Sequence, residues 1–159
     1  MIARTRLYID TSILGATTDP GPPERITATR ELLEGIALGK WEAFISTLVL
    51  SEVDQAAEQI RRKVAEELRG TSMLVLEETV ASVELARRYV DASAIPASAE
   101  NDARHIAIAS VHDIRIIVSW NFRHMVNIER KRRINAVNLA EGFPLIDLVS
   151  PWEVRSDEA

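Results

Sequence analysis

The stretch Arg115-Ile116-Ile117-Val118-Ser119 decides the fold, because its central residues form an unbroken β-branched apolar run. Such a run is typical of a strand that is buried on both faces of a parallel sheet. Further short apolar runs predict strands at 7–9, 41–45 and 73–76. A last run at 145–149 fits either a fifth strand or an extended tail.

Segments with helical spacing separate these runs. Pro22-Pro23-Glu24 favours a helix start, since proline suits the first turn and an acid suits the positive helix end. Ser46-Thr47 supplies caps for the next helix, and 127–142 predicts a long helix near the end. Alternating strands and helices predict βαβ units, and therefore a three-layer α/β/α domain around a parallel sheet of four to five strands. Ligands of such folds bind beyond the carboxyl ends of the strands, where the strand order reverses.

Composition narrows the class of protein. With 159 residues, the chain suits one domain, which we expect over 1–150 with a short tail at 151–159. The absence of cysteine excludes disulfide scaffolds, thiolate zinc sites and cysteine nucleophiles. No stretch approaches the roughly 20 apolar residues of a membrane span, so we expect a cytoplasmic protein without a membrane partner. The formal net charge of -5 argues against a nucleic-acid partner at first sight.

Two polar residues follow predicted strands. Asp10 ends the strand at 7–9, where it fits either a turn cap for Thr11 and Ser12 or a ligand for a cation. Asn121 follows the strand around Val118, and we expect it to mirror Asp10 on the neighbouring strand. Its amide carries an acceptor but no charge.

Two further acids lie in the first turns of predicted helices. Glu52 falls on the apolar side of the helix after 41–45, although a lone glutamate is usually at the surface. Asp102 is in phase with the inward positions Ile106 and Ala109. It could serve the helix dipole, but Glu100 fills that role from a more exposed phase, which leaves Asp102 for another one.

These four side chains are expected at one rim of the sheet. Clustered carboxylates repel each other, and sharing a divalent cation relieves the repulsion. Mg²⁺ takes one or two carboxylates plus waters and substrate phosphate oxygens, and Mn²⁺ has similar preferences. Such a site suits phosphodiester hydrolysis.

At this point the sequence resembles the PIN domain family, the small metal-dependent ribonucleases that include VapC-like toxins. The resemblance covers nearly the whole chain and rests on four segments in order. They are Tyr8-Ile9-Asp10-Thr11-Ser12, Ile45-Ser46-Thr47-Leu48-Val49-Leu50-Ser51-Glu52-Val53, Asn101-Asp102-Ala103-Arg104-His105-Ile106-Ala107-Ile108-Ala109 and Ile117-Val118-Ser119-Trp120-Asn121-Phe122.

The resemblance implies an endoribonuclease that holds Mg²⁺ or Mn²⁺ through Asp10, Glu52 and Asp102. It implies that Ser12 supports the first acid, and it makes a homodimer and an antitoxin partner plausible. The commoner fourth acid is replaced by Asn121, which removes one negative charge and puts a second metal ion in doubt.

Other residues could support the site. His105 could orient Asp102 or contact a phosphate, although a core histidine with a satisfied partner is the commoner case. The basic residues concentrate after Asn121, and a track for the RNA backbone is expected there unless they form a solvated helix face. The proposed RNA contacts are Arg123, His124, Arg130 and Lys131.

Two alternatives differ in class. One is a PIN-like module that binds nucleic acid or protein without catalysis, its pocket inactive after losing the fourth acid. The other is a phosphotransfer enzyme or receiver on a similar sheet. It ranks last, because Asp10-Thr11-Ser12 lacks a second acid and no lysine follows a late strand.

Overall fold

A computed structural model describes residues 3–18, 21–121 and 127–154. Its centre is one five-stranded sheet in the order β3-β2-β1-β4-β5, and every neighbouring pair is parallel. The strands are β1 (Arg6–Ile9), β2 (Glu42–Ser46), β3 (Leu74–Leu76), β4 (Ile116–Val118) and β5 (Asp147–Val149). The sequence prediction of a parallel sheet is confirmed, and the run at 145–149 contributes a strand.

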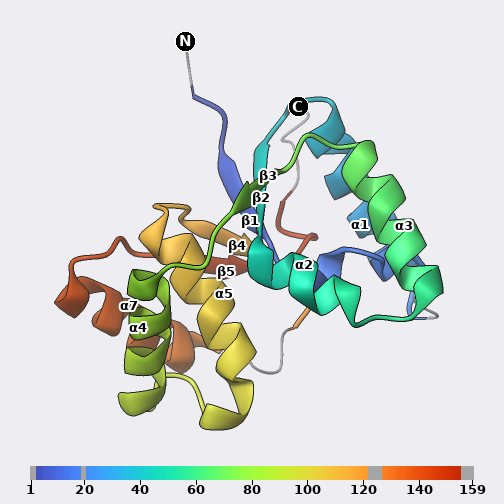
Figure 1. Ribbon diagram of the computed structural model, residues 1–159. Helices are drawn as coiled ribbons and strands as arrows, with labels where there is room; N and C mark the ends of the chain where they lie inside the picture. The colour runs from blue at the N-terminus through green and yellow to red at the C-terminus, as the bar shows by residue number, and fades with distance from the viewer. Residues whose placement is uncertain (1–2, 19–20, 122–126, 155–159) are drawn as a thin grey trace.

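Helices cover both faces of the sheet. In Figure 1, α1 and α3 lie on one side of the strands, and α4, α5 and α7 lie on the other. This confirms the three-layer α/β/α architecture. The helices are α1 (Pro23–Ala37), α2 (Thr47–Asp54), α3 (Glu58–Arg69), α4 (Val80–Asp91), α5 (Glu100–Val111) and α7 (Ile128–Glu141). Short 3-10 turns occupy Thr11–Ile13, Ala16–Thr18 and Ala97–Ala99.

Local sequence signals account for several helix ends. The Ser46 hydroxyl accepts a hydrogen bond from the Val49 amide at 3.2 Å, so the last residue of β2 caps α2. The Asn127 side chain caps α7 in the same way. Gly142 ends α7 with a φ of 81°, a conformation that costs glycine little.

The central strands and α5 form the middle of the core. Tyr8, Ile9, Ile117 and Val118 are fully buried. All residues of α5 from His105 to Ser110 are buried as well. Burial on both faces explains why β4 reads as an unbroken apolar run.

The register at the centre of the sheet corrects one expectation. Ile9 pairs with Val118, so Asp10 lies opposite Ser119 and Asn121 stands two residues further on. The expectation that Asn121 mirrors Asp10 was wrong in register, because β4 ends before Ser119. The strand order still reverses at β1, which has β2 on one side and β4 on the other.

Two observations complete the fold. Beyond β5, the Trp152 ring packs edge-on against the Trp120 ring, with 4.6 Å between their centroids.

Within the described ranges, no helix is both long and apolar enough to cross a membrane.

Candidate active site

Asp10 lies at the carboxyl end of β1 and is only 4% exposed. Its Oδ2 accepts hydrogen bonds from the Ser12 hydroxyl at 2.8 Å and from the Ser119 hydroxyl at 2.7 Å. Hydrogen bonds to a buried carboxylate offset the cost of its burial. The second oxygen, Oδ1, faces His105 Nε2 at 3.5 Å.

Ser119 is a site residue that sequence reasoning missed. Ser119 is buried; its hydroxyl donates to Asp10 and accepts a hydrogen bond from the backbone N–H of Asn121 at 2.9 Å. It thereby connects the ends of β1 and β4. The signal was a small hydroxyl residue directly after the β4 run, but only the register of the two strands assigns it to Asp10.

Glu52 projects from α2 toward the same edge. Its Oε1 accepts hydrogen bonds from the Thr11 hydroxyl at 2.9 Å and from His105 Nε2 at 2.5 Å. The side chain is 29% exposed, so the carboxylate still borders solvent. His105 therefore lies between Glu52 and Asp10, and its Nε2 is hydrogen-bonded to Glu52.

The contact between His105 and Glu52 shifts the pKa values of the two groups in opposite directions. Burial by itself would lower the pKa of His105, but the hydrogen bond to Glu52 and the charge of Asp10 raise it above the ordinary value. Burial by itself would raise the pKa of Glu52, but the hydrogen bond from His105 and its charge hold it below the ordinary value. The charge of Asp102 also acts on His105.

A buried hydroxyl chain supports the other face of the imidazole. Tyr8 Oη lies 2.7 Å from His105 Nδ1 and 2.7 Å from the Ser46 hydroxyl. The hydrogen bonds from Tyr8 Oη to His105 and to Ser46 can each run in either direction, according to which atoms carry the protons. Burial raises the pKa of Tyr8, which keeps its hydroxyl neutral. His105 is thus fixed from both ring nitrogens.

Asp102 and Asn121 form a second pair at this edge. The Asn121 amide donates to Asp102 Oδ1 at 3.2 Å, and both residues are half-buried. Asp102 stands in the first turn of α5, as the helical phase predicted. Asn121 therefore connects the end of β4 to α5, while Ser119 connects it to Asp10.

The donor set suits a hard cation, although it does not form a complete cage. The candidate metal ligands Asp10, Glu52 and Asp102 all offer carboxylate oxygens, the ligand type that Mg²⁺ and Mn²⁺ prefer. Across residues 3–18, 21–121 and 127–154, no group of three or more His, Asp and Glu side chains is arranged to hold a metal ion. Mg²⁺ needs only one or two protein carboxylates when waters and phosphate complete its shell. The residues present therefore fit such an ion.

The basic residues expected to contact RNA are only partly placed. Arg123 and His124 lie outside the described residues. Lys131 forms an ion pair with Asp147 of β5 at 3.1 Å, which neutralises part of its charge. Arg130 is half-buried in the first turn of α7.

Comparisons with known proteins agree on the fold. The family model for the PIN domain matches residues 7–131. One similar solved structure is that of VapBC2 from Rickettsia felis bound to a DNA fragment from their promoter. It is 15% identical with a TM-score of 0.59, and the match covers 92% of this chain and 98% of that chain. Another is Mycobacterium tuberculosis VapC20, described as a toxin that cleaves the sarcin-ricin loop. It is 16% identical with a TM-score of 0.51, and the match covers 88% of this chain and 98% of that chain. No curated protein matches the sequence.

Proposed function

The chain belongs to the PIN domain family, and from this premise we propose that it is a metal-dependent endoribonuclease. Its reaction would be the hydrolysis of RNA phosphodiester bonds. We further propose that it acts in the cytoplasm as the toxin of a toxin–antitoxin pair.

The environment of Asp10 carries this proposal. A carboxylate buried to this degree is costly unless donors or a cation surround it. Two serine hydroxyls fix one oxygen of Asp10, while the other points toward His105 and stays without a short hydrogen bond among the described residues. Two more carboxylates, on α2 and α5, act on the same imidazole. This arrangement lies where the strand order reverses, the usual ligand site of such sheets.

The carboxylates proposed to serve Mg²⁺ or Mn²⁺ are Asp10, Glu52 and Asp102, one or two of them binding the ion directly while waters and phosphate complete its shell. When bound, the ion would polarise the phosphodiester and acidify a water molecule. Ser12 and Ser119 hold Asp10 in place. His105 orients Glu52 through its Nε2 proton, and Asn121 orients Asp102 through its amide. The basic residues Arg123, His124, Arg130 and Lys131 are proposed to contact the RNA backbone.

The solved structures support the choice of partners. One is described as VapBC2 with promoter DNA, and the other as a toxin that cleaves the sarcin-ricin loop. By analogy, we propose RNA as the substrate and an antitoxin protein as the regulator. A second copy of the chain as a homodimer partner is proposed from the family resemblance alone.

Cleavage of a mixed RNA substrate tests the activity. Protein stripped of metal with EDTA is assayed before and after addition of Mn²⁺ or Mg²⁺. We expect cleavage only with metal, and a loss of about 100-fold or more in Asp102→Asn, because a neutral amide binds a hard cation weakly. Glu129→Gln is the matched control, since Glu129 is an exposed acid on α7. Equal activity in both variants would contradict the assignment of Asp102.

The non-catalytic alternative has its own supporting observation. His105 stands between Asp10 and Glu52, and Asn121 replaces an acid, so fewer charges are available to a metal ion. RNA binding that needs no metal and leads to no cleavage would favour that alternative.

A further inference from the structure

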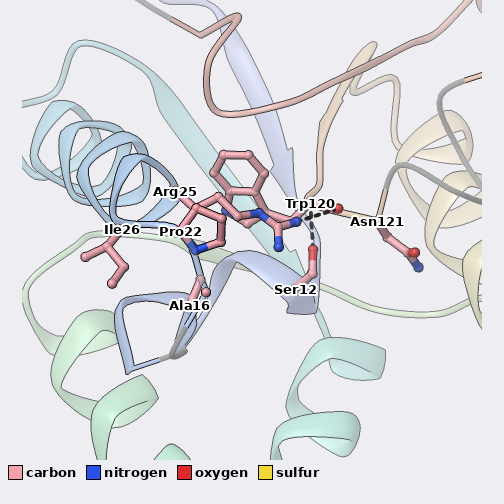
Figure 2. A pocket seen from close by; sticks show the side chains of 8 residues that line it. Ser12, Ala16, Pro22, Arg25, Ile26, Trp120 and Asn121 are labelled. Atoms are coloured by element: carbon pink, nitrogen blue, oxygen red, sulfur yellow. Dashed lines mark hydrogen bonds between the residues drawn. The ribbon is translucent and has the colours of Figure 1, made fainter.

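A cavity of about 330 Å³ shares Ser12 and Asn121 with the candidate active site. This volume lies within the range of small-ligand sites. Figure 2 shows the side chains around it, with Pro22 and Ile26 on one side and Asn121 on the other. The lining residues are Ser12, Ala16, Gly21, Pro22, Arg25, Ile26, Trp120 and Asn121.

The cavity adjoins the candidate active site directly. Ser12 and Asn121 belong to both, because each lines the cavity and also contacts an acid. The Ser12 hydroxyl donates to Asp10 and accepts the Trp120 amide at 2.9 Å, a contact drawn in Figure 2. A nucleotide in the cavity would therefore be next to a phosphodiester held at Asp10.

Arg25 is the charged residue of this cavity. Its guanidinium lies 4.7 Å from the centroid of the Trp120 ring, and Nη2 donates to the Trp120 carbonyl at 3.1 Å. The side chain is half-buried, and within the described part of the chain no acid forms an ion pair with it. A planar cation held in this way keeps unused N–H donors for a ligand.

Trp120 is a fixed support for Arg25. Its ring is only 6% exposed, its Nε1 donates to the Thr29 hydroxyl at 2.9 Å, and Trp152 packs against it edge-on. The buried Trp120 leaves little surface for a base to stack on. The guanidinium of Arg25, which covers this ring, is the flat surface that borders the cavity.

We propose that this cavity binds the nucleobase next to the scissile phosphodiester, and that Arg25 determines which base is accepted. The inference rests on the proposed ribonuclease function. Apolar walls from Ala16, Pro22 and Ile26 suit the face of a base better than a phosphate, which needs donors on several sides. Arginine recognises guanine through paired donors to O6 and N7, so guanine is the expected base.

Cleavage of an RNA pool with randomised sequence, read by sequencing of the product ends, tests the proposal. We expect the wild-type products to share guanine at one position beside the cut. In Arg25→Ala the preference for guanine at that position should fall about 10-fold or more. Arg25→Lys keeps the charge but loses the planar donors, and should lose the preference as well.

Arg30→Ala is the matched control, because Arg30 is an exposed arginine on the same helix. It should cleave like the wild type. A uniform slowing of all sites in Arg25→Ala, or an unchanged preference, would overturn the assignment of Arg25. Unchanged preference in Arg25→Lys would contradict selection of the base through the paired planar donors of Arg25.

Binding of free nucleotide separates this inference from the proposed function. GMP and AMP are titrated calorimetrically into EDTA-treated protein at concentrations up to millimolar. We expect tighter binding of GMP, weakened in Arg25→Ala and unchanged in Asp10→Asn. If the wild type cleaves no RNA but GMP binding depends on Arg25, the nuclease proposal fails and the subsite stands. If GMP binding is absent, or is the same in Arg25→Ala, the subsite is wrong whatever the nuclease assay shows.

Discussion

The buried carboxylate of Asp10 is stabilised by contacts to both of its oxygens. Ser12 lies in the turn that follows β1, Ser119 directly follows β4, and His105 belongs to α5. Ser119→Ala should therefore lower the free energy of unfolding by about 1–3 kcal/mol, the usual cost of removing a hydrogen bond to a charged group. Cleavage should fall about 10- to 100-fold, as supporting residues of metal ligands typically cost.

Ser110→Ala is the control for this prediction. Ser110 is also a buried serine, but its partners are Tyr89 and Asn138. Denaturant unfolding and RNA cleavage are measured for both variants. A loss of activity in Ser110→Ala as large as in Ser119→Ala would mean that reduced stability alone explains the effect.

Asn121 stands where the sequence resemblance to the PIN domain family leads us to expect an acid. Asn121→Asp removes the amide that donates to Asp102 and places a like charge beside it. We expect the metal-free protein to lose about 1 kcal/mol of stability, and the stabilisation by Mn²⁺ to increase. Denaturant unfolding with EDTA and with Mn²⁺ measures both. An unchanged response to Mn²⁺ would contradict a role for this position beside the metal.

The residues of the site differ in how far sequence could identify them. The sequence predicts Asp10, Glu52 and Asp102 at one edge of the sheet, from a strand end and the first turns of two helices, and in the structure all three act on His105. Ser119 could not be predicted, since its contact with Asp10 depends on strand register. Arg25 was not singled out either, because its position over Trp120 joins segments 95 residues apart.

Among the elements, α5 is tied to the segment before α4 by an ion pair. Arg104 donates to Glu78 from Nε at 2.8 Å and from Nη2 at 2.7 Å. The hydrogen bonds from Arg104 hold the pKa of Glu78 below its ordinary value. A carboxyl whose folded pKa is lowered stabilises the protein above its unfolded pKa, about 4.3, and loses this contribution as the pH falls through the folded value.

Glu78→Gln should therefore cost about 1–2 kcal/mol at pH 7. The difference from the wild type should shrink as the pH falls below about 4. Denaturant unfolding at both pH values checks the prediction, with Glu58→Gln as the control, since Glu58 pairs with Arg62 at the surface. A difference that persists at low pH would show that the ion pair is not its source.

The elements themselves were largely predictable. Four strands and the helices between them follow from apolar runs and helical spacing, whereas the run at 145–149 fitted either a strand or an extended tail. The exact ends were less predictable: β4 stops at Val118, where the run suggested Ser119. The hydroxyl of Ser119 is used by Asp10 instead, a tertiary contact that a local pattern does not report.

At the scale of the whole molecule, the net charge of -5 does not decide the partner. A cation bound by acids at the carboxyl edge of the sheet makes the local charge positive, so that a phosphate can bind there. Binding of Mn²⁺ to the folded state should raise its stability by about 2.7 kcal/mol at 100 times the dissociation constant. Denaturant unfolding at increasing Mn²⁺ measures this rise, and its full persistence in Asp10→Asn would place the ion elsewhere.

The most direct measurement of the central claim is RNA cleavage by the wild type and Asp10→Asn, compared in EDTA and in Mn²⁺. Near-ultraviolet circular dichroism first establishes that both are folded. We predict cleavage by the wild type in Mn²⁺ alone, and a loss of about 100-fold or more in Asp10→Asn. Cleavage in EDTA, equal cleavage by Asp10→Asn, or no cleavage of any RNA by the folded wild type would contradict a metal-dependent ribonuclease built on Asp10.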